Sequence, residues 1–169
     1  SAGALTTQLA YGMKARTRNS PFEAVSIAEP RFKAAIVVSG QGVKRGWIKE
    51  DAWSDIKGPM FVITGSEDVA SVSDETPATR RHPYEYAPAG DKYLLFIQGA
   101  THSSYQGKTK LALLGDKDPA NVTDIQSMVA AGTTAFLDAY LNKDAGGLAY
   151  LKEDRLKAYC STNAEVLRK

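Results

Sequence analysis

Three runs of apolar residues, each about as long as a strand, constrain most strongly what this chain can fold into. They are AAIVVS at residues 34–39, MFVIT at residues 60–64 and YLLFIQ at residues 93–98. Each run is rich in β-branched or aromatic residues and ends at or near a glycine. Continuous rather than alternating hydrophobicity is typical of parallel strands that helices cover on both faces. The runs therefore predict the mostly parallel sheet of an α/β domain.

A helical pattern precedes the first run. Leu5, Leu9 and Met13 recur at every fourth position, which places them on one face of a helix. This spacing predicts a helix that starts just after Ser1 and ends before Pro21.

A longer helical pattern covers residues 123–141, where Thr123 and Gln126 form a T-x-x-Q capping box. Its apolar residues fall on one helical face: Ile125, Met128, Val129, Phe136, Leu137, Tyr140 and Leu141. The tail at residues 148–167 has a weaker periodicity and predicts one or two short helices. Strands that alternate with helices predict one domain over residues 1–169, with ligands bound beyond the carboxyl ends of the strands.

The composition excludes several classes of protein. A chain of 169 residues with 43% hydrophobic and 24% charged residues is typical of a globular domain with a sizeable core. The 21 Lys and Arg residues are scattered and nearly balanced by 19 Asp and Glu residues, which argues against a nucleic-acid partner. No run of about 18 apolar residues is present to span a membrane. The single cysteine, Cys160, excludes an internal disulfide and a cysteine-based zinc site.

Polar residues follow the three apolar runs, where a parallel sheet binds its ligands. Among them are Asp68 after the second run and His102 after the third run. The chain itself begins with Ser1, Ala2 and Gly3 directly before a predicted helix. This start matches the last three positions of G-x-S-x-G, the nucleophile elbow of α/β-hydrolases. The order of serine, aspartate and histidine is also the order found in those enzymes.

The chain resembles the C-terminal part of an α/β-hydrolase over residues 1 to about 141. The stretches IKGPMFVITGSEDV and GDKYLLFIQGATHSSY are especially similar to esterases of the dienelactone-hydrolase, chlorophyllase and platelet-activating-factor-acetylhydrolase type. The resemblance implies that Ser1 is the nucleophile, Asp68 the acid of the triad and His102 the general base. It also implies that Ala2, the residue after the nucleophile, contributes a backbone N–H to the oxyanion hole.

Ester hydrolysis needs these groups for a physical reason. A serine hydroxyl is a weak nucleophile until a base removes its proton, and a neutral imidazole does this near neutral pH. A carboxylate holds the imidazole in the correct tautomer, and backbone N–H groups stabilise the oxyanion. We expect a small-molecule or lipid-like ester as substrate, an acyl-enzyme intermediate, and neither a metal nor an organic cofactor.

Other residues compete for these roles. His82 is the only other histidine, but it precedes the third run, where we expect a surface role. Glu67 and Asp74 compete with Asp68 for the acid. Glu67 is equally well explained as a solvated loop residue, and Asp74 as the N-cap of the turn or helix that follows it. We therefore favour Asp68 and His102.

Two residues that follow the first run are candidates for binding the substrate. Gln41 lies directly after the predicted strand, and Trp47 offers an aromatic wall for an acyl or alcohol group. Core packing explains Trp47 and the nearby Trp53 equally well.

The resemblance starts at the nucleophile, so the strands that precede it in the family do not match any part of this chain. We expect an upstream segment or a separate chain to complete the sheet, because a half-sheet exposes an unpaired edge and an apolar face. Either the polypeptide is cut before Ser1, or it continues upstream of Ser1. A third explanation is an N-terminal nucleophile whose own α-amino group is the base. It ranks last because it leaves Asp68 and His102 without a role.

Two further functions remain open from the sequence. A thioesterase or a peptidase uses the same triad on a different acyl derivative. A non-catalytic subunit or binding module of the same fold retains the triad residues without an active nucleophile.

Overall fold

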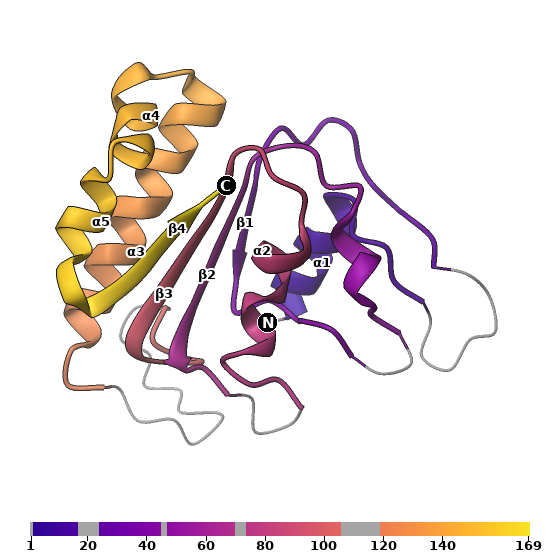
Figure 1. Ribbon diagram of the computed structural model, residues 1–169, viewed down its shortest axis with the longest axis horizontal. Helices are drawn as coiled ribbons and strands as arrows, with labels where there is room; N and C mark the ends of the chain where they lie inside the picture. The colour runs from indigo at the N-terminus through magenta and orange to yellow at the C-terminus, as the bar shows by residue number, and fades with distance from the viewer. Residues whose placement is uncertain (1, 17–23, 45–46, 70–73, 106–118) are drawn as a thin grey trace.

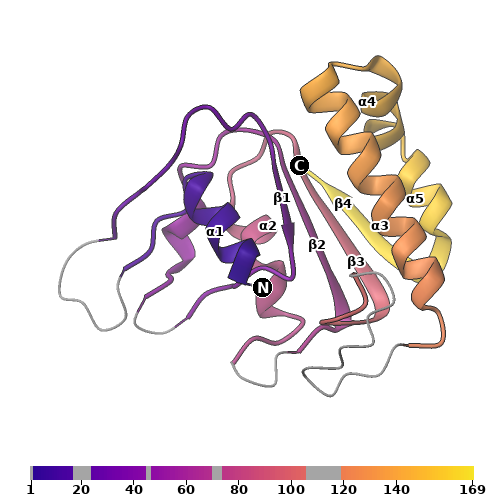
Figure 2. The same cartoon turned by 180° about the vertical axis from the view of Figure 1, so that it is seen from behind.

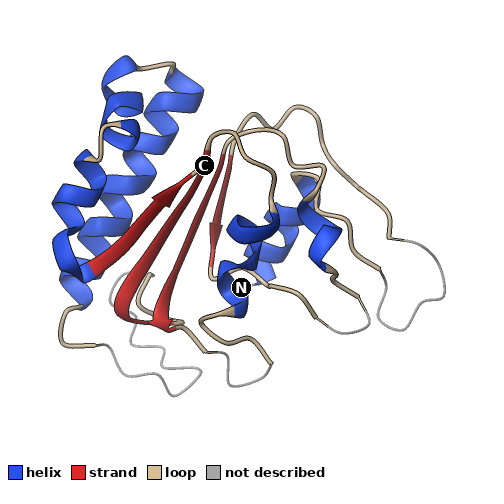
Figure 3. Ribbon diagram, viewed as in Figure 1, coloured by secondary structure: helices blue, strands red, loops and turns tan. Residues whose placement is uncertain are grey.

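The protein is described by a computed structural model that covers residues 2–16, 24–44, 47–69, 74–105 and 119–169. These residues form a four-stranded sheet in the order β1-β2-β3-β4, with helices on either side (Figures 1 and 3). The first three strands are parallel, and the fourth pairs antiparallel with β3. Their bounds are Ala35–Val38 for β1, Met60–Glu67 for β2, Lys92–Thr101 for β3 and Ala164–Arg168 for β4. An α/β architecture with a mostly parallel sheet is thus confirmed.

The three apolar runs all form strands, as predicted. The centre of β2 is buried on both faces, since six consecutive residues from Met60 to Gly65 are buried. Both β2 and β3 extend beyond the apolar runs into polar residues, as far as Glu67 and Thr101 respectively. These extensions carry the chain toward the carboxyl edge of the sheet, where Asp68 and His102 follow.

The helices cover the sheet in two layers (Figures 1 and 2). On one side lie α3 (Val122–Leu137), α4 (Ala145–Lys152) and α5 (Arg155–Cys160). On the other side lie α1 (Ala2–Ala10), η1 (Glu50–Trp53), η2 (Thr79–Arg81) and α2 (His82–Tyr86). No helix in the described ranges is long and apolar enough to cross a membrane.

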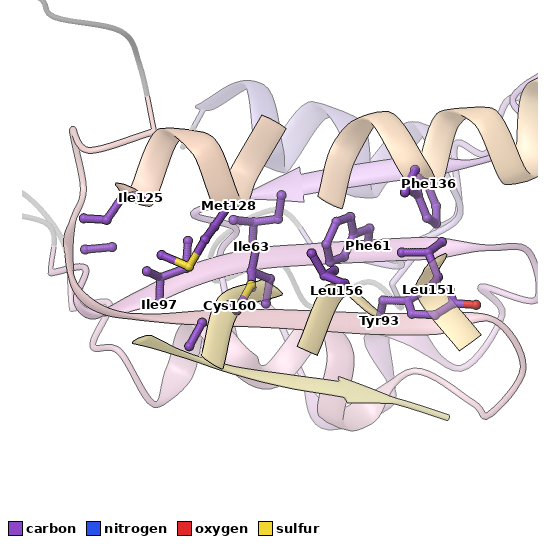
Figure 4. Close-up of a cluster of buried hydrophobic side chains, with 14 of the residues drawn as sticks. Phe61, Ile63, Tyr93, Ile97, Ile125, Met128, Phe136, Leu151, Leu156 and Cys160 are labelled. Carbon is purple, nitrogen blue, oxygen red and sulfur yellow. The ribbon is translucent and has the colours of Figure 1, made fainter. Parts of the chain in front are cut away.

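Each face of the sheet has its own core. Figure 4 shows the α3 side, where side chains from β2 and β3 meet side chains from the three covering helices. Phe61 is central to this core, with its ring centroid 5.6 Å from Phe136 and 6.2 Å from Tyr93. On the opposite face, Trp53 is fully buried and its indole Nε1 donates to Gln8 Oε1 at 2.8 Å. Core packing therefore accounts for Trp53.

The first helix forms as predicted, but with a different face toward the core. The helix α1 ends at Ala10, so Met13 is buried in the segment that follows it. The residues of α1 that are buried are Ala4 and Gln8. The predicted Leu5 and Leu9 pack against this core but are only partly buried. Gln8 is buried in their place and accepts the Trp53 indole N–H.

The long helix differs from its prediction at both ends. It begins at Val122 after the N-cap Asn121, whose side chain makes no capping bond, so Thr123 lies inside the first turn and the predicted capping box is wrong. At the other end, α3 continues into a π-helical turn, η3 (Asp138–Asn142). The wider turn rotates the following residues around the axis. Leu141, which lies in this turn, is exposed rather than part of the apolar face, and so is Leu137, the last residue of α3.

The tail forms the two predicted helices, α4 and α5, and then a strand that the sequence did not predict. This strand, β4, pairs antiparallel with β3: Leu167 of β4 lies opposite Leu94 of β3, and Val166 lies opposite Leu95. The prediction of helix up to residue 167 was wrong because five residues carry little periodicity of their own. Pairing with the backbone of β3 decides their structure.

The strand β1 lies at one edge of the described sheet and pairs there with β2. Its residues Ile36 and Val38 pack against the α3-side core but are only partly buried. Half-buried aliphatic side chains in an edge strand are compatible with the predicted pairing of this edge with an upstream segment or a separate chain, which remains a prediction.

Gly65 allows β2 and β3 to approach closely just before Asp68. A Cβ at this position would lie 2.5 Å from the Ala100 Cβ and 2.6 Å from the Ala100 carbonyl oxygen. We expect Gly65→Ala to lower the free energy of unfolding by about 1–3 kcal/mol, as overpacking does in a tight core. Urea unfolding measures this change. Gly3→Ala is the control, because an added Cβ meets nothing within 4 Å there and alanine favours a helix. A Gly65→Ala protein as stable as wild type would contradict the expectation.

Candidate active site

Asp68 follows β2 directly and is fully buried at the carboxyl edge of the sheet. Its Oδ2 accepts hydrogen bonds from the Ser39 hydroxyl, from Thr64 Oγ1 at 2.9 Å and from the Tyr105 hydroxyl at 3.2 Å. Its Oδ1 lies 2.9 Å from His102 Nδ1. A carboxylate that accepts from this many donors is held in a single orientation.

These contacts also set the charge of the carboxyl group. Burial by itself would raise the pKa of Asp68. The hydrogen bond from His102, the positive charge of Arg80 and the hydrogen bonds from Ser39 and Thr64 oppose burial and hold the pKa below its usual value. Asp68 is therefore ionised at neutral pH.

The lowered pKa of Asp68 predicts a specific loss of stability in acid. Because the folded state holds this carboxylate more tightly than the unfolded chain, its contribution is full above about pH 4, the ordinary aspartate value, and is lost as the pH falls through the lower folded-state pKa. Urea unfolding of wild type and Asp68→Asn across this range tests the effect. We expect the difference in free energy of unfolding between them to shrink on acidification. A difference that stays constant would contradict the assignment.

His102 follows β3, and a tight turn holds it in place. Thr101 N donates to Ser104 Oγ at 2.9 Å, and Ser104 N donates to the Thr101 carbonyl at 3.2 Å. The His102 side chain is 9% exposed. An ionised carboxylate can only accept, so the short contact to Asp68 places the proton on Nδ1 and leaves Nε2 as the basic nitrogen. This is the tautomer that a general base requires.

Arg80, in η2, is a residue of this site that the sequence did not predict, as are the three donors to Asp68 Oδ2. Its side chain is fully buried, and Nε lies 2.9 Å from both the carbonyl oxygen and Oδ1 of Asp68. In the sequence, Arg80 stands in a run of charged and polar residues, TRRH at positions 79–82, which is typical of a solvated surface. No local pattern distinguishes it from the adjacent Arg81, which is partly exposed and pairs with Glu85 and Glu165.

The other predicted site residues are placed as follows. Ser1 lies outside the described residues, and Ala2 is an exposed residue in the first turn of α1. Gln41 is partly buried in the segment after β1. Trp47 packs partly against the α1-side core, with Lys44 Nζ 5.8 Å from its ring centroid. The structure thus brings Asp68 and His102 together, while the substrate-binding roles of Gln41 and Trp47 stay predictions.

The competing residues lie in other surroundings. Glu67 is exposed at the end of β2. Asp74 is also exposed, and the N-cap of η2 is Ala78, so the predicted role of Asp74 as N-cap is wrong. The turn before η2 is closed instead by reciprocal hydrogen bonds between the threonines at positions 76 and 79. His82 is partly buried rather than on the surface, because its Nδ1 accepts the Val43 N–H at 3.1 Å. Burial lowers the pKa of His82.

Within the described ranges, no group of three or more His, Cys, Asp or Glu side chains is arranged to hold a metal ion. The arrangement of Asp68 and His102 is suited to moving a proton to and from a hydroxyl group that approaches Nε2. Comparison of the chain with models of known protein families and with curated proteins finds no match.

Proposed function

We propose that this protein is a serine hydrolase of the α/β-hydrolase type that cleaves carboxylic esters. The observation that carries the proposal is the pair of Asp68 and His102. A buried, ionised carboxylate meets imidazole Nδ1 at 2.9 Å, at the carboxyl ends of two adjacent parallel strands. An acid and a base in this relation form two thirds of a catalytic triad.

The third member is proposed to be Ser1. The last turn of α1 lies beside the residues that precede β1, since Tyr11 donates to the Lys33 carbonyl at 3.1 Å and Glu29 N donates to the Ala10 carbonyl at 2.8 Å. A nine-residue helix rises about 13 Å. The first turn, with Ala2, therefore lies toward the carboxyl end of β1 (Figure 1), the same edge of the sheet as Asp68 and His102.

In the proposed reaction, the serine oxygen attacks the carbonyl carbon of the ester and His102 Nε2 takes the hydroxyl proton. Asp68 stabilises the imidazolium that forms, and the Ala2 N–H donates to the oxyanion. His102 then returns the proton to the departing alkoxide, and an acyl-enzyme remains. Water attacks this acyl group with His102 again as the base, which releases the carboxylic acid and restores the serine.

Labelling with a fluorophosphonate tests the proposal directly, because only an activated serine reacts quickly with it. The native preparation is labelled and digested, and the modified peptide is identified by mass spectrometry. We expect the label on Ser1, with hydrolysis of p-nitrophenyl esters lost in proportion to labelling. Faster turnover of a thioester or a peptide than of an ester would instead assign the site to a thioesterase or a peptidase.

An unlabelled protein, or a label on another serine, would contradict the proposed nucleophile. An unlabelled and inactive protein would favour the non-catalytic binding module. In that case Asp68 and His102 would serve only to join the ends of β2 and β3.

A further inference from the structure

We propose that Arg80 is a positioning residue of this site, which joins the carboxyl ends of β1 and β2 and thereby holds Asp68, and through Asp68 also His102, in the reactive arrangement. The inference rests on the proposed hydrolase function for its effect on rate. Its structural part, the orientation of the His102 ring, can be measured without any activity.

The guanidinium group binds two of the strand ends and lies beside the third. Nε faces Asp68, after β2, at 2.9 Å from both its carbonyl oxygen and Oδ1. Nη1 donates to the carbonyl of Ser39 at 2.7 Å and to that of Gly40 at 3.2 Å, both after β1. Nη2 lies 3.3 Å from Nδ1 of His102, after β3. A planar group with fixed donors sets the relative positions of all its partners at once.

Charge balance alone does not explain these contacts. A cation that only neutralises Asp68 needs no more than the carboxylate, whereas Arg80 also binds two backbone carbonyls of the β1 end. Ser39 has a φ of 51°, in the left-handed region that residues other than glycine rarely adopt. Its carbonyl accepts from Arg80 while its hydroxyl donates to Asp68. The arginine thus holds a constrained residue that itself orients the carboxylate.

Arg80 reaches the His102 ring through Asp68. His102 Nδ1 has two neighbours, Asp68 Oδ1 at 2.9 Å and Arg80 Nη2 at 3.3 Å. The protonated Nδ1 donates to the carboxylate, and the guanidinium occupies the adjacent side. Nη2 is also a donor, so it makes no hydrogen bond to the protonated Nδ1. A ring that turned away from Asp68 would lose its bond to the carboxylate. Arg80 therefore acts on the ring through Asp68.

The test compares Arg80→Met, which removes the donors and keeps the length of the side chain, with Arg81→Met. Arg81 undergoes the same chemical change one residue away, where its partners Glu85 and Glu165 lie outside the site. Arg80→Lys is the second variant. It keeps a buried cation, so it remains informative if Arg80→Met does not fold, but one ammonium cannot reproduce the contacts that Nε and Nη1 make to two strand ends.

Two measurements are made on each folded variant. The first is kcat and KM with an ester substrate, where a misplacement of about 1 Å lowers the rate about 100-fold. We expect a loss of that size in kcat for Arg80→Met with little change in KM, an intermediate loss for Arg80→Lys, and wild-type values for Arg81→Met. The second is the imidazole signals of ¹⁵N-histidine-labelled protein. The chain has only two histidines, so a His82→Asn spectrum assigns His102.

In the wild type we expect one tautomer of His102, with a protected proton on Nδ1. In Arg80→Met, and in part in Arg80→Lys, we expect that proton to exchange with solvent and its signal to broaden. A folded Arg80 variant with wild-type kcat and an unchanged Nδ1 signal overturns the proposal. The proposal is also overturned if the activity of each Arg80 variant falls only in proportion to the fraction of the protein that is folded.

The two measurements separate this inference from the proposed function. A wild-type protein that hydrolyses no ester, but whose protected Nδ1 proton is lost in the Arg80 variants, would refute the hydrolase and support the positioning role. An active wild type whose Arg80 variants retain both the wild-type kcat and the Nδ1 signal would support the hydrolase and refute the positioning role.

Discussion

Replacing His102 by asparagine is expected to lower kcat/KM for ester hydrolysis by about 10⁴-fold or more. Asparagine suits this test because its amide nitrogen can take the place of Nδ1 and donate to Asp68 Oδ1, which the histidine contacts at 2.9 Å. The substitution therefore removes Nε2, the nitrogen that accepts the serine proton, and keeps a donor for the buried carboxylate. The loss then reports on the base rather than on the fold.

His82→Asn is the matched control. His82 uses Nδ1 to accept the Val43 N–H, and the asparagine Oδ1 can accept the same bond. We expect this variant to retain turnover and fluorophosphonate labelling. Steady-state kinetics and labelling rates measure both variants, with circular dichroism to confirm that each is folded. Retained turnover in His102→Asn would remove His102 from the mechanism, and equal losses in the two variants would point to a shared structural cause.

Replacing Asp68 by asparagine is expected to have two large effects. The first is on rate: an amide in place of the carboxylate can no longer hold Nδ1 as a donor or stabilise the imidazolium, and kcat should fall by about 10⁴-fold. The second is on stability. Asp68 and Arg80 are both fully buried, and loss of the carboxylate leaves the arginine without its counter-charge. Breaking a buried pair from one side costs about 3–5 kcal/mol.

A double variant separates these effects. Asp68→Asn together with Arg80→Met removes the uncompensated charge, so we expect it to regain part of the lost free energy of unfolding and none of the lost kcat. Glu67→Gln is the control for the loss of a carboxylate, because Glu67 is exposed at the adjacent position. Urea unfolding and ester kinetics measure all the variants. An Asp68→Asn protein with wild-type stability would show that the ion pair contributes little, and wild-type kcat would exclude Asp68 as the acid.

The acid and base of the site could be predicted because both follow strands whose apolar runs are local and strong. Once residues 60–64 and 93–98 are identified as adjacent parallel strands, Asp68 and His102 must emerge at the same edge of the sheet. The structure brings them to 2.9 Å. The contact distance between them depends on local packing, such as the close approach of β2 and β3 at Gly65, which the periodicity of the sequence does not predict.

Local sequence motifs predicted the ends of the helices less well than the apolar runs predicted the strands. Thr123 and Gln126 match a capping box, but the helix starts at Val122, where backbone hydrogen bonds from Val122 to Pro119 and from Ile125 to Asn121 set the first turn. Backbone bonds that form on folding prevail over a side-chain cap whose contribution is about 1 kcal/mol.

The sequence by itself determined the three parallel strands, the helices around them, and the placement of an aspartate and a histidine at neighbouring strand ends. These features follow from patterns of burial within about ten residues, which the chain carries locally. Only the tertiary structure decided that residues 164–168 form an edge strand and that Arg80, rather than Arg81, is buried beneath the site. Both depend on which distant segments meet. The strand β4 needs the backbone of β3, and the buried guanidinium needs acceptors from the ends of β1 and β2, which come together only when the sheet is formed.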